Sequence, residues 1–179
     1  MITNEMRRHF DKRTNRHIEL VQKYIRKINK RWDIAGHDSS KFEAPEKIPY
    51  TYLTWRYKCN RENTPYEVPE EMKDAIHDAT YHHVKNNRHH PECWDENIKS
   101  NPINKDNRDT PSGVIVDATK MPVTAIIEMC ADWCAMSEEL GGHPAKWAKD
   151  NIGVRWNFDK HQIEYINHLI EVMWSNDEL

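Results

Sequence analysis

Apolar side chains recur every three to four residues near the start of the chain, which is the period of an amphipathic α-helix. Residues 7–32 contain neither proline nor glycine. The apolar stripe consists of Ile18, Val21, Ile25, Ile28 and Trp32. His17 lies one helical turn before Val21, so it falls at the edge of this stripe rather than on the solvent face. We predict a long first helix that carries a histidine at the border of the core.

Two stretches in the middle of the chain also carry helical signals. Aromatic residues at positions 50–59 follow Pro49 and indicate a short helix. Pro69, Glu70 and Glu71 form a favourable helix start, because acidic side chains stabilise the positive end of the helix dipole. The stripe of this later helix consists of Met72, Ile76, Ala79 and His83, with His82 beside it.

Two more helices are predicted in the last third of the chain. One has Pro122 near its start and Gly141 at its end. The other begins near Asp159, and Gln162 stands three residues further on as a capping-box partner. Together these patterns predict an all-α fold of about five to seven helices. A length of 179 residues favours one compact domain spanning residues 1–179.

Residues 95–120 form the longest stretch without a helical pattern. They are polar, rich in asparagine and aspartate, and interrupted by Pro102, Pro111 and Gly113. Loops of this length in compact domains are often functional or disordered. Two interpretations remain open, a lid over a ligand and a disordered excursion.

Composition limits the classes of partner. Apolar residues make up 37% of the chain and mean hydropathy is -0.97, but 31% charged residues of mixed sign and seven tryptophans argue against disorder. A net charge of -3 gives no general attraction to nucleic acid or to an anionic membrane. No apolar run approaches the ~18 residues that span a bilayer, and the first residues contain no apolar signal region. We expect a cytoplasmic protein that binds a small molecule, with a homo-oligomer left open.

Four of the eleven histidines lie within residues 82–90, as the pairs His82-His83 and His89-His90. Neutral imidazole is the commonest metal ligand in proteins and titrates near neutral pH, so this cluster indicates metal binding or proton transfer. Burying an imidazole without a partner is costly, and a metal ion or a carboxylate would satisfy it. The alternative is a polar patch on the surface.

Two other segments supply donors of the same kind. His37 and Asp38 stand next to each other at a predicted bend, where both side chains could reach one ion. Glu128 and Asp132 are four residues apart and share a helix face near the buried stripe. The plainer alternatives are that Asp38 caps a helix and that Lys41 is a solvated lysine.

The order of these residues resembles the HD-domain superfamily of metal-dependent phosphohydrolases. The pattern of that superfamily is a histidine, a His-Asp pair, further histidines in some branches, and an aspartate. The corresponding residues here are His17, His37-Asp38, the histidines from His82 to His90, and Asp132. Lys41 matches a lysine that often follows the pair. The resemblance implies an HD-domain-like helical fold built around a metal site.

The chain is still more similar to an uncharacterised family of small proteins found in bacteria and their phages. The shared motifs are His37-Asp38 with Ser40-Lys41, His82-His83 with Asn87, His89-His90 with Trp94, Met121-Pro122, and Glu128-Met129 with Asp132-Trp133. They cover most of the chain from His17 to Met136. This similarity implies a fold and a metal site more than a reaction, and the extra histidines argue against a site for a single ion.

On this basis we assign roles to individual residues. One or two divalent ions of manganese, iron, cobalt, nickel or zinc suit nitrogen and carboxylate donors. The assigned ligands are His17, His37, Asp38 and Asp132 for a first ion and His82 and His90 for a second, with Asp38 as the bridge. Lys41, His83, His89 and Glu128 are assigned to catalysis, and Arg88 and Trp94 to substrate binding. Of each histidine pair, we expect one member to bind metal.

The favoured function is hydrolysis of a nucleotide or a small phosphorylated metabolite by attack of a metal-bound water. Two alternatives remain open. One is a diiron oxygenase of the same superfamily. The other is a non-catalytic phage protein that binds a nucleotide or a host factor and keeps metal only for stability.

Overall fold

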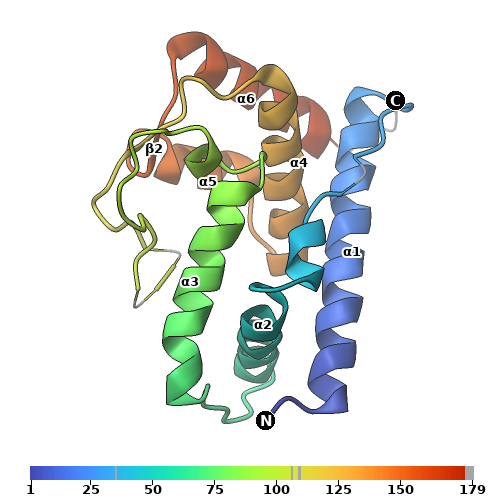
Figure 1. Cartoon of the computed structure of the whole chain (residues 1–179). Coiled ribbons are helices and arrows are strands. Elements are labelled where there is room, and N and C mark those ends of the chain that lie inside the picture. Colours follow the sequence, from blue (N-terminus) through green and yellow to red (C-terminus); the bar gives the residue numbers. More distant parts are fainter. Residues whose placement is uncertain (35, 106, 109, 176–179) are drawn as a thin grey trace.

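Six α-helices account for most of the chain in the computed structural model, which describes residues 1–34, 36–105, 107–108 and 110–175 (Figure 1). The helices are α1 (Asn4–Ile28), α2 (Lys47–Arg61), α3 (Glu70–Asn86), α4 (Val123–Leu140), α5 (Pro144–Asn151) and α6 (Lys160–Trp174). Two 3-10 helices, η1 (Ser39–Phe42) and η2 (Pro91–Cys93), and two short strands, β1 (Val116–Asp117) and β2 (Trp156–Asn157), complete the described elements. The prediction of an all-α fold with five to seven helices is confirmed.

The ends of the helices follow from local capping. Helix α1 begins three residues before the predicted start, because the Thr3 side chain accepts a hydrogen bond from the Met6 backbone at 3.2 Å. It ends at Ile28, where Asn29 takes an extended backbone, so Trp32 leaves the predicted helical stripe. Helix α6 has the predicted capping box between Asp159 and Gln162.

Helix α4 is the centre of the main core. Its buried side chains include Ile126, Met129 and Cys130, which are at most 1% exposed. They pack against Val21 and Ile25 of α1 and against the apolar face of α6. Gly141 ends α4 with φ +72°, a backbone conformation that glycine adopts without steric cost. No helix in the described residues is long and apolar enough to cross a membrane.

Helix α1 contacts two different layers along its length. Its first half packs on α2 and α3 through a second cluster that contains Phe10, Tyr50, Leu53 and Ala79. Its second half packs on α4, as the side-by-side ribbons in Figure 1 show. His17 lies between these two regions and is only 3% exposed. The fold therefore places this imidazole inside the molecule, between the two regions against which α1 packs.

The long polar segment 95–120 lies along the outer side of α3 in Figure 1, away from α1. Ile103 is buried, and its carbonyl oxygen lies 3.1 Å from His77 Nε2 on α3. Near the end of the segment, β1 pairs in parallel with β2, with Val116 opposite Trp156. The predicted loop thus packs on the helix that follows α2, and two of its residues, 106 and 109, lie outside the described part.

Candidate metal centre

Four separate segments bring histidines and aspartates together at the junction of α1, α3 and α4. Helix α1 contributes His17, and the segment before η1 contributes His37 and Asp38. Helix α3 contributes His83, the turn after it contributes His89 and His90, and α4 contributes Asp132. The four residues His17, His37, His83 and His89 are each 3% exposed. The alternative of a polar surface patch at residues 82–90 is therefore wrong for His83 and His89.

Asp38 lies at the middle of this cluster and is 1% exposed. One carboxylate oxygen, Oδ2, lies 3.8 Å from His17 Nε2 and 3.9 Å from His37 Nε2. The other, Oδ1, lies 3.1 Å from His83 Nε2 and 3.7 Å from His89 Nε2. Each oxygen thus faces a different pair of imidazoles, which is the arrangement that a bridging carboxylate requires.

The backbone explains how Asp38 reaches this position beside His37. Asp38 has φ 58° and ψ 11°, a left-handed conformation that aspartate tolerates better than most residues. It precedes η1, but its side chain makes no capping hydrogen bond. The alternative that Asp38 serves as a plain helix cap is therefore wrong. The left-handed turn directs the carboxylate into the cluster instead.

Among the described residues, three groups of donor atoms are small enough to hold one cation each, and two of them share no residue. The first contains His17, His37 and Asp132, with donor atoms within 4.8 Å of one another. Asp132 Oδ1 lies 2.8 Å from His17 Nε2 and 4.0 Å from His37 Nε2. The second consists of His83, His89 and His90. Asp38 stands between the two groups, so it could serve both.

The outward-facing nitrogens of these histidines meet three glutamates. His83 Nδ1 lies 2.8 Å from Glu46, which is fully buried, and His17 Nδ1 lies 3.6 Å from Glu139. Glu46 accepts the Nδ1 proton of His83 and leaves its Nε2 lone pair free for a metal ion, whereas His17 Nδ1 lies too far from Glu139 for a hydrogen bond. Among the described atoms, His83 Nε2 and Asp38 Oδ1 are buried and lack a hydrogen-bond partner, as expected where a cation would sit between them.

Glu128 is the third of these glutamates, and it serves two imidazoles. Its Oε1 lies 2.8 Å from His37 Nδ1 and 3.3 Å from His89 Nδ1. Burial would raise the pKa of Glu128, but these two imidazoles outweigh burial and lower the pKa to about 2. Glu128 is therefore ionised at neutral pH and orients one histidine from each donor group. These three residues also form a compact donor group of their own.

Electrostatics in the cluster favour ionised aspartates. Burial would raise the pKa of Asp38, but the Lys41 ammonium and the His37 imidazole outweigh it and hold the pKa well below its usual range. Burial opposes ionisation of Asp132 as well, and His17 overcomes it, so the pKa of Asp132 is also lowered. Both carboxylates keep their charge, which is the form that binds a cation.

The pKa values of His17 and His90 shift in opposite directions. Burial would lower the pKa of His17, but the hydrogen bond to Asp132 and the nearby Glu139 carboxylate raise it to about 9. Burial and the neighbouring His89 hold the pKa of His90 well below its usual range. His17 therefore carries a proton in the metal-free protein and His90 does not.

Comparison with known proteins identifies the family of this chain. Residues 6–173 match the protein family described as "Family of unknown function (DUF5662)". The chain belongs to this family. No curated protein and no solved structure matches the chain. The family description assigns no activity to DUF5662, so what this site does has to be argued from its geometry.

The structure separates the two members of the first histidine pair of this DUF5662 chain. His82, which we had assigned to the second ion, points out of the cluster, with Nδ1 2.7 Å from Glu46 and a side chain that is 39% exposed. Successive helical residues differ by about 100° in direction, so only one of two neighbours can face the cluster. Of this pair, the geometry places only His83 among the donor atoms of the cluster. In the second pair, His89 and His90 both face the donor group.

Three of the residues assigned to catalysis or to substrate binding lie at the edge of the cluster. Lys41 Nζ contacts Asp38 Oδ2, so Lys41 is paired with the central carboxylate and is not a solvated lysine. Arg88 is exposed and stacks over the Trp94 ring at 5.4 Å. Trp94 Nε1 donates to the Arg88 carbonyl at 2.9 Å. Trp94 therefore holds the Arg88 turn in place.

The sequence interpretation missed Glu46 and Glu139. Glu139 lies seven residues after Asp132 and so falls on the same helix face, which is a signal that the sequence does contain. Glu46 carries no comparable signal, because it lies 37 residues from the His83 imidazole that it contacts. Ser40 adds to this contact by donating to Glu46 at 3.0 Å.

Proposed function

We propose that this DUF5662 chain is a metal-dependent phosphohydrolase with an HD-domain-like site, acting on a nucleotide or a small phosphorylated metabolite. The observation that carries the proposal is the orientation of four buried histidines. Their Nε2 atoms face Asp38 and Asp132, while their Nδ1 atoms face Glu46, Glu128 and Glu139. A purely structural core has no need for four imidazoles with this common orientation.

The residues at this site fit a pair of divalent ions. His17, His37 and Asp132 would hold one ion, and His83, His89 and His90 the other, with Asp38 between them. Nitrogen and carboxylate donors suit manganese, iron, cobalt, nickel and zinc. Ions bound there would supply Lewis acidity and lower the pKa of water toward neutrality. Two aspartates and three glutamates surround the cluster. The cations beside them are Lys41, which contacts Asp38, and Arg13 of α1, which contacts Glu139 at 3.4 Å. This excess of carboxylates favours the uptake of positive charge.

Side chains around the ligands would support attack at phosphorus. Lys41 contacts the central carboxylate and would offset negative charge on a phosphate that approaches Asp38. Glu46 and Glu128 hold their histidines in one tautomer and one orientation. The donors are therefore preorganised, so that little rearrangement would accompany the reaction.

The same donors also suit a diiron oxygenase, because histidine and carboxylate ligands hold iron(II). A non-catalytic, metal-stabilised protein that binds a nucleotide or a host factor would need the metal but no open coordination position. The three functions differ in what the protein consumes and in what it releases. The hydrolase releases phosphate without oxygen, the oxygenase consumes oxygen, and the binding protein forms no product.

Elemental analysis and activity measurements test the proposal. The protein would be purified without a histidine tag, its metal content measured, and a panel of nucleotides and sugar phosphates tested for phosphate release with added manganese. We expect one or two ions per chain and phosphate release that requires them. Protein without bound metal, or bound metal without phosphate release from any compound, would contradict the proposal. Oxygen consumption by the iron-loaded protein would favour the oxygenase.

A further inference from the structure

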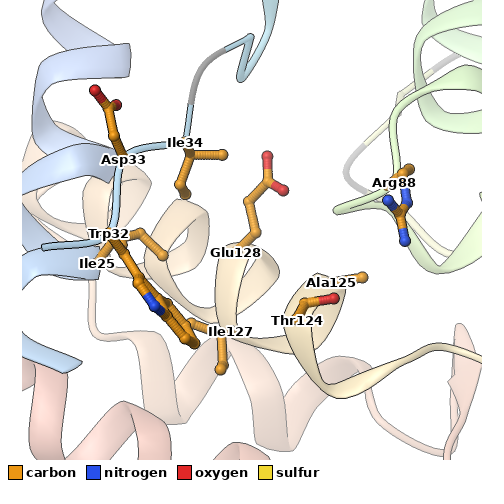
Figure 2. Close-up of a pocket in the computed structure, with 9 residues that line it drawn as sticks. All are labelled: Ile25, Trp32, Asp33, Ile34, Arg88, Thr124, Ala125, Ile127 and Glu128. Atoms are coloured by element: carbon orange, nitrogen blue, oxygen red, sulfur yellow. The ribbon is translucent and has the colours of Figure 1, made fainter. Parts of the chain in front are cut away.

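A cleft of about 210 Å³ opens next to the metal centre, and Figure 2 shows the side chains that line it. It lies between the segment after α1, the turn after α3 and the first turns of α4. Glu128, which orients His37 and His89, forms part of its wall. The cleft is therefore one side chain away from the proposed ligands. Its volume is below the roughly 300 Å³ of typical small-molecule pockets, so it suits one ring system rather than a whole nucleotide.

One wall of the cleft presents an indole that packing does not explain. Trp32 is 40% exposed although tryptophan is usually well buried. The Gln22 side chain holds this wall in place, because it donates to the Trp32 carbonyl at 2.7 Å and accepts from the Ile34 backbone at 2.9 Å. Asp33, between them, also lines the cleft, but its carboxylate points away from the indole (Figure 2). This wall thus offers an aromatic face.

The opposite wall presents a cation. Arg88 lines the cleft, and among the described residues its guanidinium has no carboxylate partner, only the Trp94 ring beneath it. The Thr124 hydroxyl also lines the cleft (Figure 2). Arg88 directly precedes His89 and His90, which belong to the second donor group. An anionic group held by Arg88 would therefore lie at the wall formed by the turn that carries these histidines.

We infer that this cleft binds the ring of a phosphorylated heteroaromatic compound, a nucleoside monophosphate rather than a sugar phosphate. The ring stacks on Trp32, and the phosphate contacts Arg88 on the opposite wall, next to the turn that carries His89 and His90. This inference rests on the proposed function, because it names the part of the substrate that the metal centre does not touch. Stacking of a base on an aromatic side chain tolerates different bases, so the cleft selects for a ring more than for one base.

The test measures binding without turnover. The four common nucleoside monophosphates and ribose 5-phosphate are titrated into chelator-treated protein with ¹⁵N-labelled indoles, and the Trp32 signal is identified with Trp32→Phe. We expect at least one nucleotide to shift that signal, with affinity at least tenfold weaker in Trp32→Ala and largely kept in Trp32→Phe. Ribose 5-phosphate should bind wild type and Trp32→Ala equally. Arg88→Ala should weaken both kinds of ligand, while Arg61→Ala, a change to an exposed arginine at the end of α2, should weaken neither.

Nucleotides that leave the Trp32 signal unchanged, or that bind Trp32→Ala as tightly as wild type, would overturn the inference. Its failure can be told apart from failure of the proposed function. If a nucleotide occupies the cleft but no phosphate ester is hydrolysed with any metal, the hydrolase fails and the cleft assignment stands. If hydrolysis proceeds with an unchanged KM in Trp32→Ala, the cleft assignment fails and the hydrolase stands.

Discussion

Asp38 is the residue on which the proposed metal site depends most. Its two oxygens face different imidazole pairs, and its backbone is left-handed. We expect Asp38→Asn to abolish stoichiometric metal binding while helix content by circular dichroism stays the same. Asparagine tolerates the left-handed backbone, so this change removes the charge and leaves the turn intact. Asp78→Asn, at an exposed position on α3, is the matched control and should keep its metal. Unchanged metal content in Asp38→Asn would contradict the assignment.

The neighbours His82 and His83 give a second residue-level test. Because His83 Nε2 faces Asp38 and His82 does not, His83→Ala should remove one ion per chain and His82→Ala should remove none. Glu46→Gln should weaken metal binding by about 10- to 100-fold, the usual effect of losing a carboxylate behind a ligand histidine. Calorimetric titration with the metal ion measures the stoichiometry and the affinity of all three variants. Loss of an ion in His82→Ala alone would reverse the assignment of the pair.

The pKa of His17 makes metal binding depend on pH. Its pKa of about 9 lies above the unfolded value of 6.5, so its protonation stabilises the metal-free fold most fully below pH 6.5, and this stabilisation is lost as pH rises through 9. A metal ion needs the neutral imidazole and must displace that proton. Affinity should therefore rise by about tenfold per pH unit between pH 7 and 9. Calorimetry in buffers of different ionisation enthalpy should report about one proton released for the ion that binds at His17.

At the scale of elements, the start of α6 shows how one residue sets a helix end. The Asp159 side chain accepts from the Gln162 backbone at 2.8 Å, and Gln162 Nε2 donates to the Met121 carbonyl before α4 at 3.0 Å. We expect Asp159→Ala to lower the free energy of unfolding by about 1 kcal/mol. Urea denaturation measures this change. Metal content should stay the same, because α6 contributes no ligand, and Asp150→Ala on α5 should affect neither quantity.

At the scale of the whole molecule, the metal centre joins segments that the hydrophobic clusters leave apart. The main core contains α4 and α6, whereas α3 and η1 contribute little to it. A bound ion would connect all of them, and binding to the folded state alone adds about 2.7 kcal/mol when free metal is 100 times its Kd. Added manganese or zinc should therefore raise Tm by about 5 to 10 °C. Chelator should reverse the shift, and Asp38→Asn should show no response. A chelator-insensitive Tm in metal-loaded wild type would contradict this prediction.

Local sequence patterns determined most of the helices. The three- to four-residue period, Pro69, Pro122, Gly141 and the Asp159 capping box act through contacts within a few residues, so they could be identified without the fold. The main errors at element scale were the ends of α1 and the absence of any prediction for α5. The Thr3 cap extends the first helix, and the eight residues of α5 are too few to form a clear apolar stripe.

The sequence by itself also indicated the donor residues, because the four segments with histidines and aspartates were visible as residue types. Only the tertiary structure decided which atoms meet. It selected His83 over His82, placed both His89 and His90 at the cluster, and revealed Glu46 and Trp32 as parts of the site and its cleft. The physical reason is that the direction of a side chain depends on helix phase and on packing between distant segments. Neither of these is a property of the residues nearby in the chain.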